Sequence, residues 1–210
     1  VMDAVLEELN VFLAKAKVYA EKIDSEIADR ENDFRSMCFW NVYNRAVLTK
    51  EVVTFYNTTW KSMDIPVDLG PEFTERIVTV TRDMFVDTVS SIEKAAKDSV
   101  KAYKRSMLRE KSMEGRNYLY LRNIIAASVE MSYISKEDFQ EWEDILVMRN
   151  LVTHNNSVAD RSKVFEINGL KLSMRPNRMM KGPPVTFVKL TSRVLDLFFE
   201  WLMTIDEAFS

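Results

Sequence analysis

The segment Ile145–Asn156, ILVMRNLVTHNN, contains the only histidine of this 210-residue chain, His154. Arg149 lies five residues before it, and Asn150 follows the arginine directly. An imidazole with an unperturbed pKa of about 6.5 transfers protons at neutral pH. The planar guanidinium of arginine binds two oxygens of a carboxylate or a phosphate at once. These residues are therefore the best candidates in the chain for acid–base chemistry at an anionic group.

On a helix at about 100° per residue, Arg149 falls near the centre of an apolar arc. The arc is formed by Phe139, Trp142, Ile145, Leu146 and Val152. A charge buried there without a partner costs several kcal/mol, so Arg149 needs either a carboxylate from another helix or a phosphate from outside. A second apolar side, formed by Val147, Met148 and Leu151, predicts packing against another body such as a second copy of the chain.

A purely structural interpretation explains the same residues. A lone histidine near a helix end often caps the helix or lies on the surface, and a buried arginine is often half of an ion pair. The chain would then be a helical scaffold or adaptor, with Arg149 paired internally and His154 exposed. No glycine-rich phosphate loop and no HExxH pattern occurs, so we expect no cofactor and no metal site.

The hexapeptide RNLVTH, Arg149–His154, resembles the Arg-x4-6-His signature of the HEPN superfamily, in which asparagine is a frequent residue after the arginine. The resemblance covers the motif closely and the surrounding helices in outline, from about Pro71 to Ser210. It implies an all-α bundle that dimerises through the motif-bearing helix. It departs from the toxins that an adenylylating nucleotidyltransferase neutralises, because those have a tyrosine where this chain has Asn156.

Many HEPN proteins are metal-independent endoribonucleases, and the resemblance implies the same activity here. His154 would be the acid–base catalyst, Arg149 the phosphate clamp and Asn150 a positioning donor. Because one chain offers one imidazole, a homodimer would supply the second. A toxin, defence or RNA-processing role, with a protein partner or antitoxin, belongs to the same expectation. The alternative is a non-catalytic HEPN-like dimer that binds RNA, a nucleotide or a protein.

A basic segment follows the motif. Its cations are Arg161, Lys163, Lys171, Arg175, Arg178, Lys181, Lys189 and Arg193, and only Glu166 opposes them within that stretch. Such a run either contacts RNA phosphates or is a solvated face. By the resemblance, we expect Asn155 and the cations Arg175, Arg178 and Lys181 to bind substrate.

Composition limits the possible folds and partners. The chain has 4 glycines and 5 prolines, which is too few for a turn-rich β fold and favours long helices. Its net charge of −3 gives no bulk attraction to nucleic acid, so any basic surface must be local. Cys38 is the only cysteine and the apolar stretches are interrupted by charges, so we expect a cytoplasmic protein outside the membrane.

Apolar periodicity predicts the elements that position the motif. Helices are expected from about Val5 to Ile27, 33 to 63, 73 to 103, 117 to 133, from Lys136 through the motif, and from about Thr191 to the end. Ser135 and Asp138 form a plausible capping box. Asn168-Gly169 between two alternating segments predicts a hairpin in which Glu166 faces Lys171. We therefore predict one helical domain over 1–210, made of an N-terminal helical pair, 1–63, and a motif-bearing bundle, 71–210, with the hairpin before the last helix.

Overall fold

A computed structural model of the chain describes residues 2–27, 33–62, 70–102, 107–154, 162–177 and 182–209. Within those ranges the chain forms seven α-helices and one two-stranded antiparallel hairpin. The hairpin comes directly before the last helix, so the predicted all-α bundle with a small inserted hairpin is confirmed. Among the described residues, no helix combines the length and the apolar character needed to cross a membrane.

Four long helices form the body of the molecule: α1 (Met2–Glu26), α2 (Phe34–Ser62), α3 (Gly70–Ala102) and α7 (Pro184–Phe209). Helix α1 packs on α2, α2 on α3, α3 on α7 and α7 on α1, so the four close into a bundle. Each contributes apolar residues at steps of three and four, because that spacing lines one face of a helix. The buried residues of α1 follow the predicted series, from Val5 through Phe12 to Ile23.

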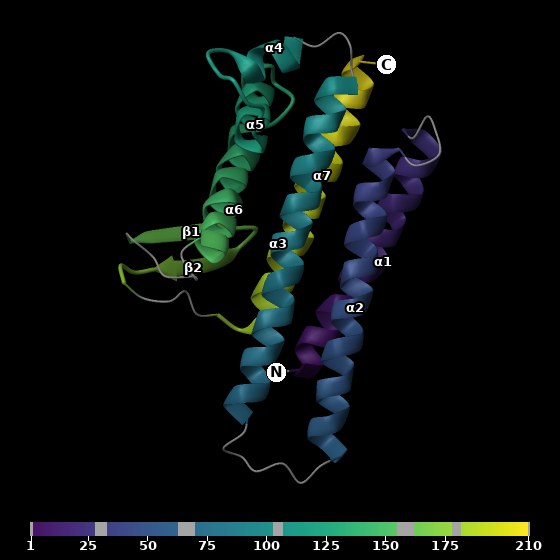
Figure 1. Ribbon diagram of the computed structural model, residues 1–210, viewed down its shortest axis with the longest axis vertical. Helices are drawn as coiled ribbons and strands as arrows, with labels where there is room; N and C mark the ends of the chain where they lie inside the picture. Colours follow the sequence, from purple (N-terminus) through teal and green to yellow (C-terminus); the bar gives the residue numbers. More distant parts are fainter. Residues whose placement is uncertain are drawn as a thin grey trace.

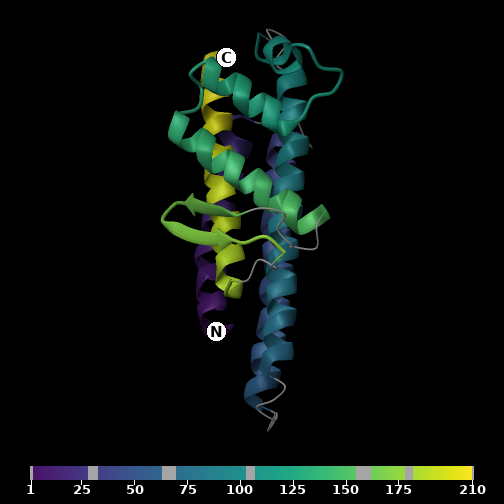
Figure 2. The same cartoon turned by 90° about the vertical axis from the view of Figure 1, so that its left-hand side faces the viewer.

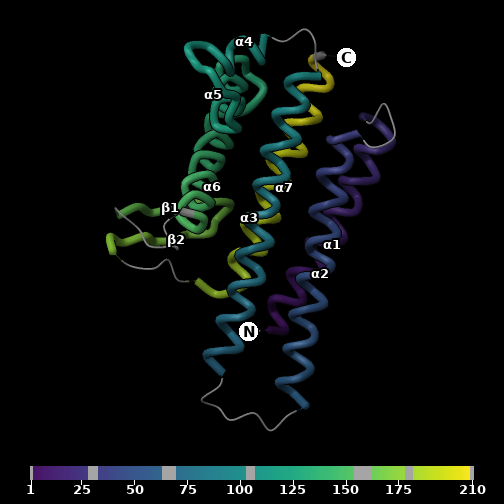
Figure 3. Tube along the Cα trace, viewed as in Figure 1, coloured from purple at the N-terminus to yellow at the C-terminus, as the bar shows by residue number. Residues whose placement is uncertain are grey.

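The segment between α3 and α7 forms a second layer on the bundle. It contains α4 (Met107–Met113), α5 (Leu121–Glu130), α6 (Lys136–His154), β1 (Lys163–Ile167) and β2 (Leu170–Met174). Figure 3 shows that it carries the chain back along the outside, so that α3 and α7 run side by side in the same direction. In Figure 2, α5 and α6 run obliquely across the bundle, and both contact α3. The motif-bearing helix is therefore on the outside of the four-helix body.

The hairpin has the predicted turn and register. Asn168 and Gly169 have φ values of 44° and 75°, the left-handed conformation that a type I′ turn requires. Glu166 pairs with Lys171 across the strands. On β1, Phe165 and Ile167 are buried, and Lys163 donates a 2.6 Å hydrogen bond to the buried Asp144 of α6. The hairpin is thus attached to the helix that bears the motif.

The start of the last helix was predicted wrongly. Helix α7 begins at Pro184, seven residues before the predicted start at Thr191. Proline suits the first position of a helix, because its missing N–H group has no intrahelical partner there. The first two turns bury Phe187, Val188 and Leu190. The prediction therefore missed the first seven residues of the helix, Pro184 to Leu190.

The described helices and both strands share one hydrophobic cluster. Trp142 of α6 and Trp201 of α7 are its largest fully buried side chains. Trp201 Nε1 donates a 2.9 Å hydrogen bond to Ser128 Oγ, which ties α7 to α5 inside the core. This buried contact gives the outer layer a defined position relative to the bundle.

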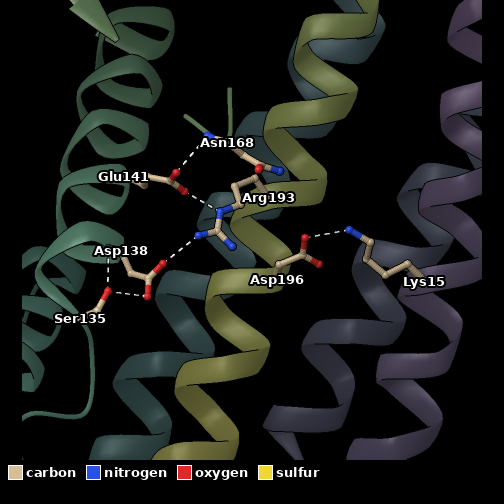
Figure 4. Close-up of polar contacts among 7 residues, drawn as sticks. All are labelled: Lys15, Ser135, Asp138, Glu141, Asn168, Arg193 and Asp196. Carbon is tan, nitrogen blue, oxygen red and sulfur yellow. Dashed lines mark hydrogen bonds and ion pairs between the residues drawn. The ribbon is translucent and has the colours of Figure 1, made fainter. Parts of the chain in front are cut away.

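A network of charged side chains, the Arg193 network, holds α6 against α7 and the hairpin turn (Figure 4). Arg193 Nε donates to Glu141 at 2.5 Å, and its Nη2 donates to Asp138 at 2.8 Å. Glu141 also accepts a 2.9 Å hydrogen bond from the backbone N–H of Asn168. The first half of α6 is therefore anchored by ionic contacts, and these position the second half, where the motif lies.

Candidate functional site

Helix α6 begins at the predicted cap and ends at the motif histidine. The Asp138 N–H donates a 3.0 Å hydrogen bond to Ser135 Oγ, and the Ser135 hydroxyl donates to the Asp138 carboxylate at 2.7 Å. The cap satisfies an N–H group that has no partner in the first turn. The helix runs for 19 residues to His154. Its local sequence therefore accounts for the start of the motif-bearing helix.

The buried face of α6 is rotated from the predicted one. Trp142, Ile145, Met148 and Leu151 are buried, in steps of three residues, whereas Phe139, Leu146 and Val152 are only partly buried. Arg149 consequently lies at the flank of the buried face, with 23% of its side chain exposed, and not at its centre. The expectation that Arg149 is in the middle of an apolar arc was wrong, because contacts with α3 and α7 select which side of α6 is covered.

The same rotation changes the predicted second apolar side. Met148 and Leu151 are part of the core of the single chain, and of that side only Val147 is partly exposed. These two residues are therefore covered by the chain's own helices and are not free to contact another copy. Dimerisation through α6 remains a prediction, and it now depends on Val147 and the polar flank of the helix.

Arg149 makes few and long contacts. Its Nη1 donates to Asn150 Oδ1 at 3.1 Å, and its Nη2 lies 4.0 Å from a carboxylate oxygen of Glu93 on α3. Its Nε is buried, and no described residue accepts a hydrogen bond from it. Glu93 has a closer partner in Lys97, at 2.7 Å on the same helix. Arg149 is thus beside a carboxylate that is already neutralised by another cation.

The guanidinium of Arg149 lines an open cleft of about 470 Å³, called the Arg149 cleft here. Its lining residues come from α6 (the α6 wall), from Tyr120 to Asn123 at the start of α5 (the α5 wall) and from α3. The lining residues are Glu93, Tyr120, Leu121, Arg122, Asn123, Leu146, Arg149 and Asn150. The volume is within the range of small-ligand sites, roughly 300–1,000 Å³. Arg149 therefore faces space that a ligand can occupy.

The α5 wall is polar and partly exposed. Arg122 donates to Glu143 of α6 from Nε at 2.8 Å and from Nη2 at 2.6 Å, and this hydrogen-bonded carboxylate raises the pKa of Arg122. Asn123 follows it in the first turn of the helix. Tyr120 is 53% exposed, and Lys97 Nζ lies 5.7 Å from the centroid of its ring. This wall was not anticipated from the sequence.

Two of the residues predicted to act in catalysis line the cleft together. Arg149 and Asn150 are neighbours on its α6 wall, and His154 is the last residue of the same helix. Arg175 is exposed after β2 and is not among the lining residues. Asn155, Arg178 and Lys181 lie outside the described residues.

The basic segment after the motif is not a continuous free surface. Lys163 pairs with Asp144 at 2.6 Å and Arg193 pairs with Glu141 at 2.5 Å, so both cations are neutralised by carboxylates of the same chain. Lys189 lies 4.0 Å from Glu8. Of the remaining described cations, Lys171 and Arg175 are exposed. The charge count along the sequence overestimated the free positive charge, because the neutralising carboxylates come from distant helices.

The sequence contained only a weak signal for the α5 wall. Arg122-Asn123 repeats the Arg-Asn dipeptide of the motif, but the same pair also occurs at Arg116-Asn117. Composition cannot distinguish these pairs, whereas the packing of α5 against α6 and α3 brings one of them to the cleft. Among the described side chains, no group of three or more His, Cys, Asp and Glu is placed to hold a metal ion.

No protein-family model matches this chain, and neither a curated protein nor a solved structure matches it. The likeness of Arg149–His154 to the HEPN signature therefore depends on the motif and its place on a helix of an all-α bundle.

Proposed function

We propose that this chain is a metal-independent endoribonuclease that holds an RNA phosphate in the Arg149 cleft. The observation that supports this is the weak pairing of Arg149: its Nη1 donates to the neutral Asn150 at 3.1 Å, and the carboxylate of Glu93 lies 4.0 Å from its Nη2 and is bound to Lys97. A phosphate offers two oxygens to the planar fork of a guanidinium. The cleft provides the space for it.

In the proposed reaction, the 2′-hydroxyl of one nucleotide attacks the adjacent phosphorus as a base removes its proton. The bond to the 5′-oxygen breaks, and an acid gives that oxygen a proton. The products are a 2′,3′-cyclic phosphate and a 5′-hydroxyl end. Negative charge grows on the non-bridging oxygens during attack, and Arg149 stabilises it. His154 acts as the acid–base catalyst, because imidazole is the side chain best suited to general acid–base catalysis.

Asn150 is suited to position the same phosphate. Its side-chain oxygen accepts the hydrogen bond from Arg149 Nη1. The amide nitrogen of that side chain therefore keeps its two N–H donors for oxygens of a substrate. The pair presents guanidinium and amide donors on one wall of the cleft.

A second copy of the chain would complete the site, since cleavage works best with one base and one acid and each chain has a single histidine. In a two-fold dimer, each copy contributes the same surface. We propose the exposed flank of α6, which includes Val147, as part of that surface. Replacing Val147 with Glu would then place an unpaired carboxylate in the interface and dissociate the dimer.

Binding without cleavage is the second candidate function. The observation that favours it is that four side chains of the lining, Arg122, Asn123, Arg149 and Asn150, bind anions without transferring protons. A non-catalytic protein with this cleft would hold RNA or a nucleotide and release it unchanged.

His154→Ala distinguishes the two functions. We expect wild-type protein to cleave a generic RNA in EDTA and leave 2′,3′-cyclic phosphate ends, and His154→Ala to leave the RNA intact while melting at the wild-type temperature. Thr153→Ala is the control, since the exposed Thr153 hydroxyl donates only to backbone carbonyls of its own helix, Arg149 O at 2.9 Å and Asn150 O at 3.4 Å. Cleavage by His154→Ala, or cleavage only with added metal, contradicts the mechanism. Binding without cleavage by wild type identifies the second function.

A further inference from the structure

We propose that the α5 wall of the Arg149 cleft is a nucleotide-binding surface, in which Tyr120 stacks an unpaired base whose phosphate is held between Arg122 and Arg149. The inference rests on the proposed function in taking RNA as the ligand. It goes beyond that function because it assigns recognition to α5, a helix that lies before the motif in the sequence and carries no part of it.

The first argument is charge. Two arginines and one glutamate line the cleft, so its lining has a net positive charge, whereas the whole chain has a net charge of −3. Glu93 and Arg122 each have a partner outside the lining, Lys97 at 2.7 Å and Glu143 at 2.6 Å, so the net positive charge is that of Arg149. The cleft is therefore a local cationic site on an acidic protein, and such a site attracts an anion.

The second argument is the orientation of Arg122. Glu143 holds it through Nε and Nη2, while its Nη1 makes no hydrogen bond to any described residue. The side chain is fixed on one edge and 70% exposed. The N–H groups of Nη1 are consequently available to a phosphate oxygen that Arg149 contacts from the α6 wall.

The third argument is the aromatic ring at the rim. Tyr120 lines the cleft and keeps more than half of its surface exposed beside Lys97. Every base has a π-face, and proteins that bind single-stranded nucleic acid combine exposed aromatic rings with nearby cations. Tyr120 and Asn123 are three residues apart at the start of α5, which places the Asn123 amide near a base stacked on the ring.

The fourth argument is size. A cleft of about 470 Å³ accepts one nucleotide and excludes a double helix. In a duplex the bases are stacked and paired, so they are not available to an aromatic side chain, whereas unpaired bases are recognised by stacking and by hydrogen bonds at their edges. The ligand class is therefore a single-stranded stretch of RNA.

The test measures binding separately from cleavage, with His154→Ala protein and a fluorescent single-stranded oligoribonucleotide. Adding Tyr120→Ala should weaken binding by about tenfold, and Tyr120→Phe should restore it because the ring remains. Tyr118→Ala is the matched control: Tyr118 is also an exposed tyrosine, with its ring 6.4 Å from that of Tyr120, but it does not line the cleft. A duplex of the same sequence should bind more weakly than the single strand.

Four results would overturn the inference: no RNA binding, equal affinity for duplex and single strand, equal losses from Tyr118→Ala and Tyr120→Ala, or mononucleotides that bind as tightly as the oligoribonucleotide. Loss of binding in Tyr120→Ala alone supports it. If the wild-type protein binds RNA through Tyr120 but does not cleave it, the proposed nuclease activity is wrong and the proposed binding surface is supported. If the wild-type protein cleaves RNA but Tyr120→Ala binds it normally, the proposed binding surface is wrong and the proposed nuclease activity is supported.

Discussion

Arg149 and Arg193 are buried to similar extents, with 23% and 17% of their side chains exposed, but their surroundings differ. Arg193 has carboxylates at 2.5 and 2.8 Å, both from the first turns of α6. Arg149 has an amide oxygen at 3.1 Å and a carboxylate at 4.0 Å that is bound to Lys97. Burial alone therefore does not distinguish a structural cation from a candidate functional one; the quality of its pairing does.

The difference follows from what each arginine contacts. Arg193 joins α7 to α6 and, through Glu141, to the hairpin turn, so its hydrogen bonds connect three elements of the fold. Arg149 lines a cleft, and its side chain donates no hydrogen bond to another described element of the fold. An incompletely paired cation at the edge of a cleft costs stability, and such a cost is typical of sites kept for a ligand.

The largest expected effect is on catalysis. Arg149→Ala should lower the rate of RNA cleavage about a hundredfold or more, since it removes stabilisation of the charge that grows on the phosphate. Stability should change by less than about 1 kcal/mol, because Glu93 keeps Lys97 at 2.7 Å and is not left unpaired. Single-turnover kinetics and thermal melting measure the two effects. Arg76→Ala, an exposed α3 arginine outside the cleft, is the control.

A large fall in the melting temperature of Arg149→Ala would contradict this prediction. It would show that the 4.0 Å contact with Glu93 stabilises the fold, and Arg149 would then be a structural cation like Arg193.

Arg193→Ala tests the other side of the comparison. It should lower the free energy of unfolding by about 2–3 kcal/mol. This loss is at or below the cost of breaking a fully buried ion pair, because Asp138 and Glu141 are partly exposed. The melting temperature should fall by about 5–10 °C. Lys189→Ala, on the same helix, breaks only an exposed 4.0 Å contact with Glu8 and should cost less than about 1 kcal/mol. Equal melting temperatures for the two variants would mean that the Arg193 network contributes no net stability.

Glu93→Gln should strengthen RNA binding. The change removes a negative charge that faces Arg149 across 4.0 Å, and a unit charge at that distance in water contributes about 1 kcal/mol, or about fivefold in affinity. The gain should shrink as salt is added. Affinity measured over a salt series checks this, with Glu137→Gln on the exposed first turn of α6 as the control. Unchanged affinity together with lower stability would indicate that Glu93 is a structural partner of Arg149.

The smallest effect concerns Glu200, near Arg193. Burial raises the pKa of this carboxyl, and Asp138, Asp196 and Glu141 add to the increase while Arg193 opposes it. A raised pKa in the folded state means that ionised Glu200 disfavours folding, so stability is lost as pH rises through that pKa. Glu200→Gln should therefore be slightly more stable than wild type at pH 7, and the difference should vanish below about pH 4.5, where both side chains are neutral. Melting temperatures across pH 4–8 check it; a less stable variant at pH 7 contradicts it.

The sequence by itself determined the elements whose causes are local. The α6 cap depends on Ser135 and Asp138, three residues apart, and the hairpin turn on the adjacent Asn168 and Gly169. The apolar face of α1 depends on steps of three and four residues. Short-range sterics and hydrogen bonds decide these features, so patterns in the sequence predict them. The placement of Arg149, Asn150 and His154 on one helix was predictable for the same reason.

Only the tertiary structure decided which charges are paired and which side of α6 is covered. Arg193 and Glu141 are 52 residues apart in the chain, and the partner of Arg149 is on α3. Contacts with α3 and α7 decide which side of α6 is buried, and the packing of α5 against α6 and α3 brings Arg122 and Tyr120 to the cleft. Pairing at such separations depends on how whole helices pack, and helix periodicity contains no information about crossing angles between elements. The motif was thus visible in the sequence, whereas the cleft that it faces was created by the packing of three helices.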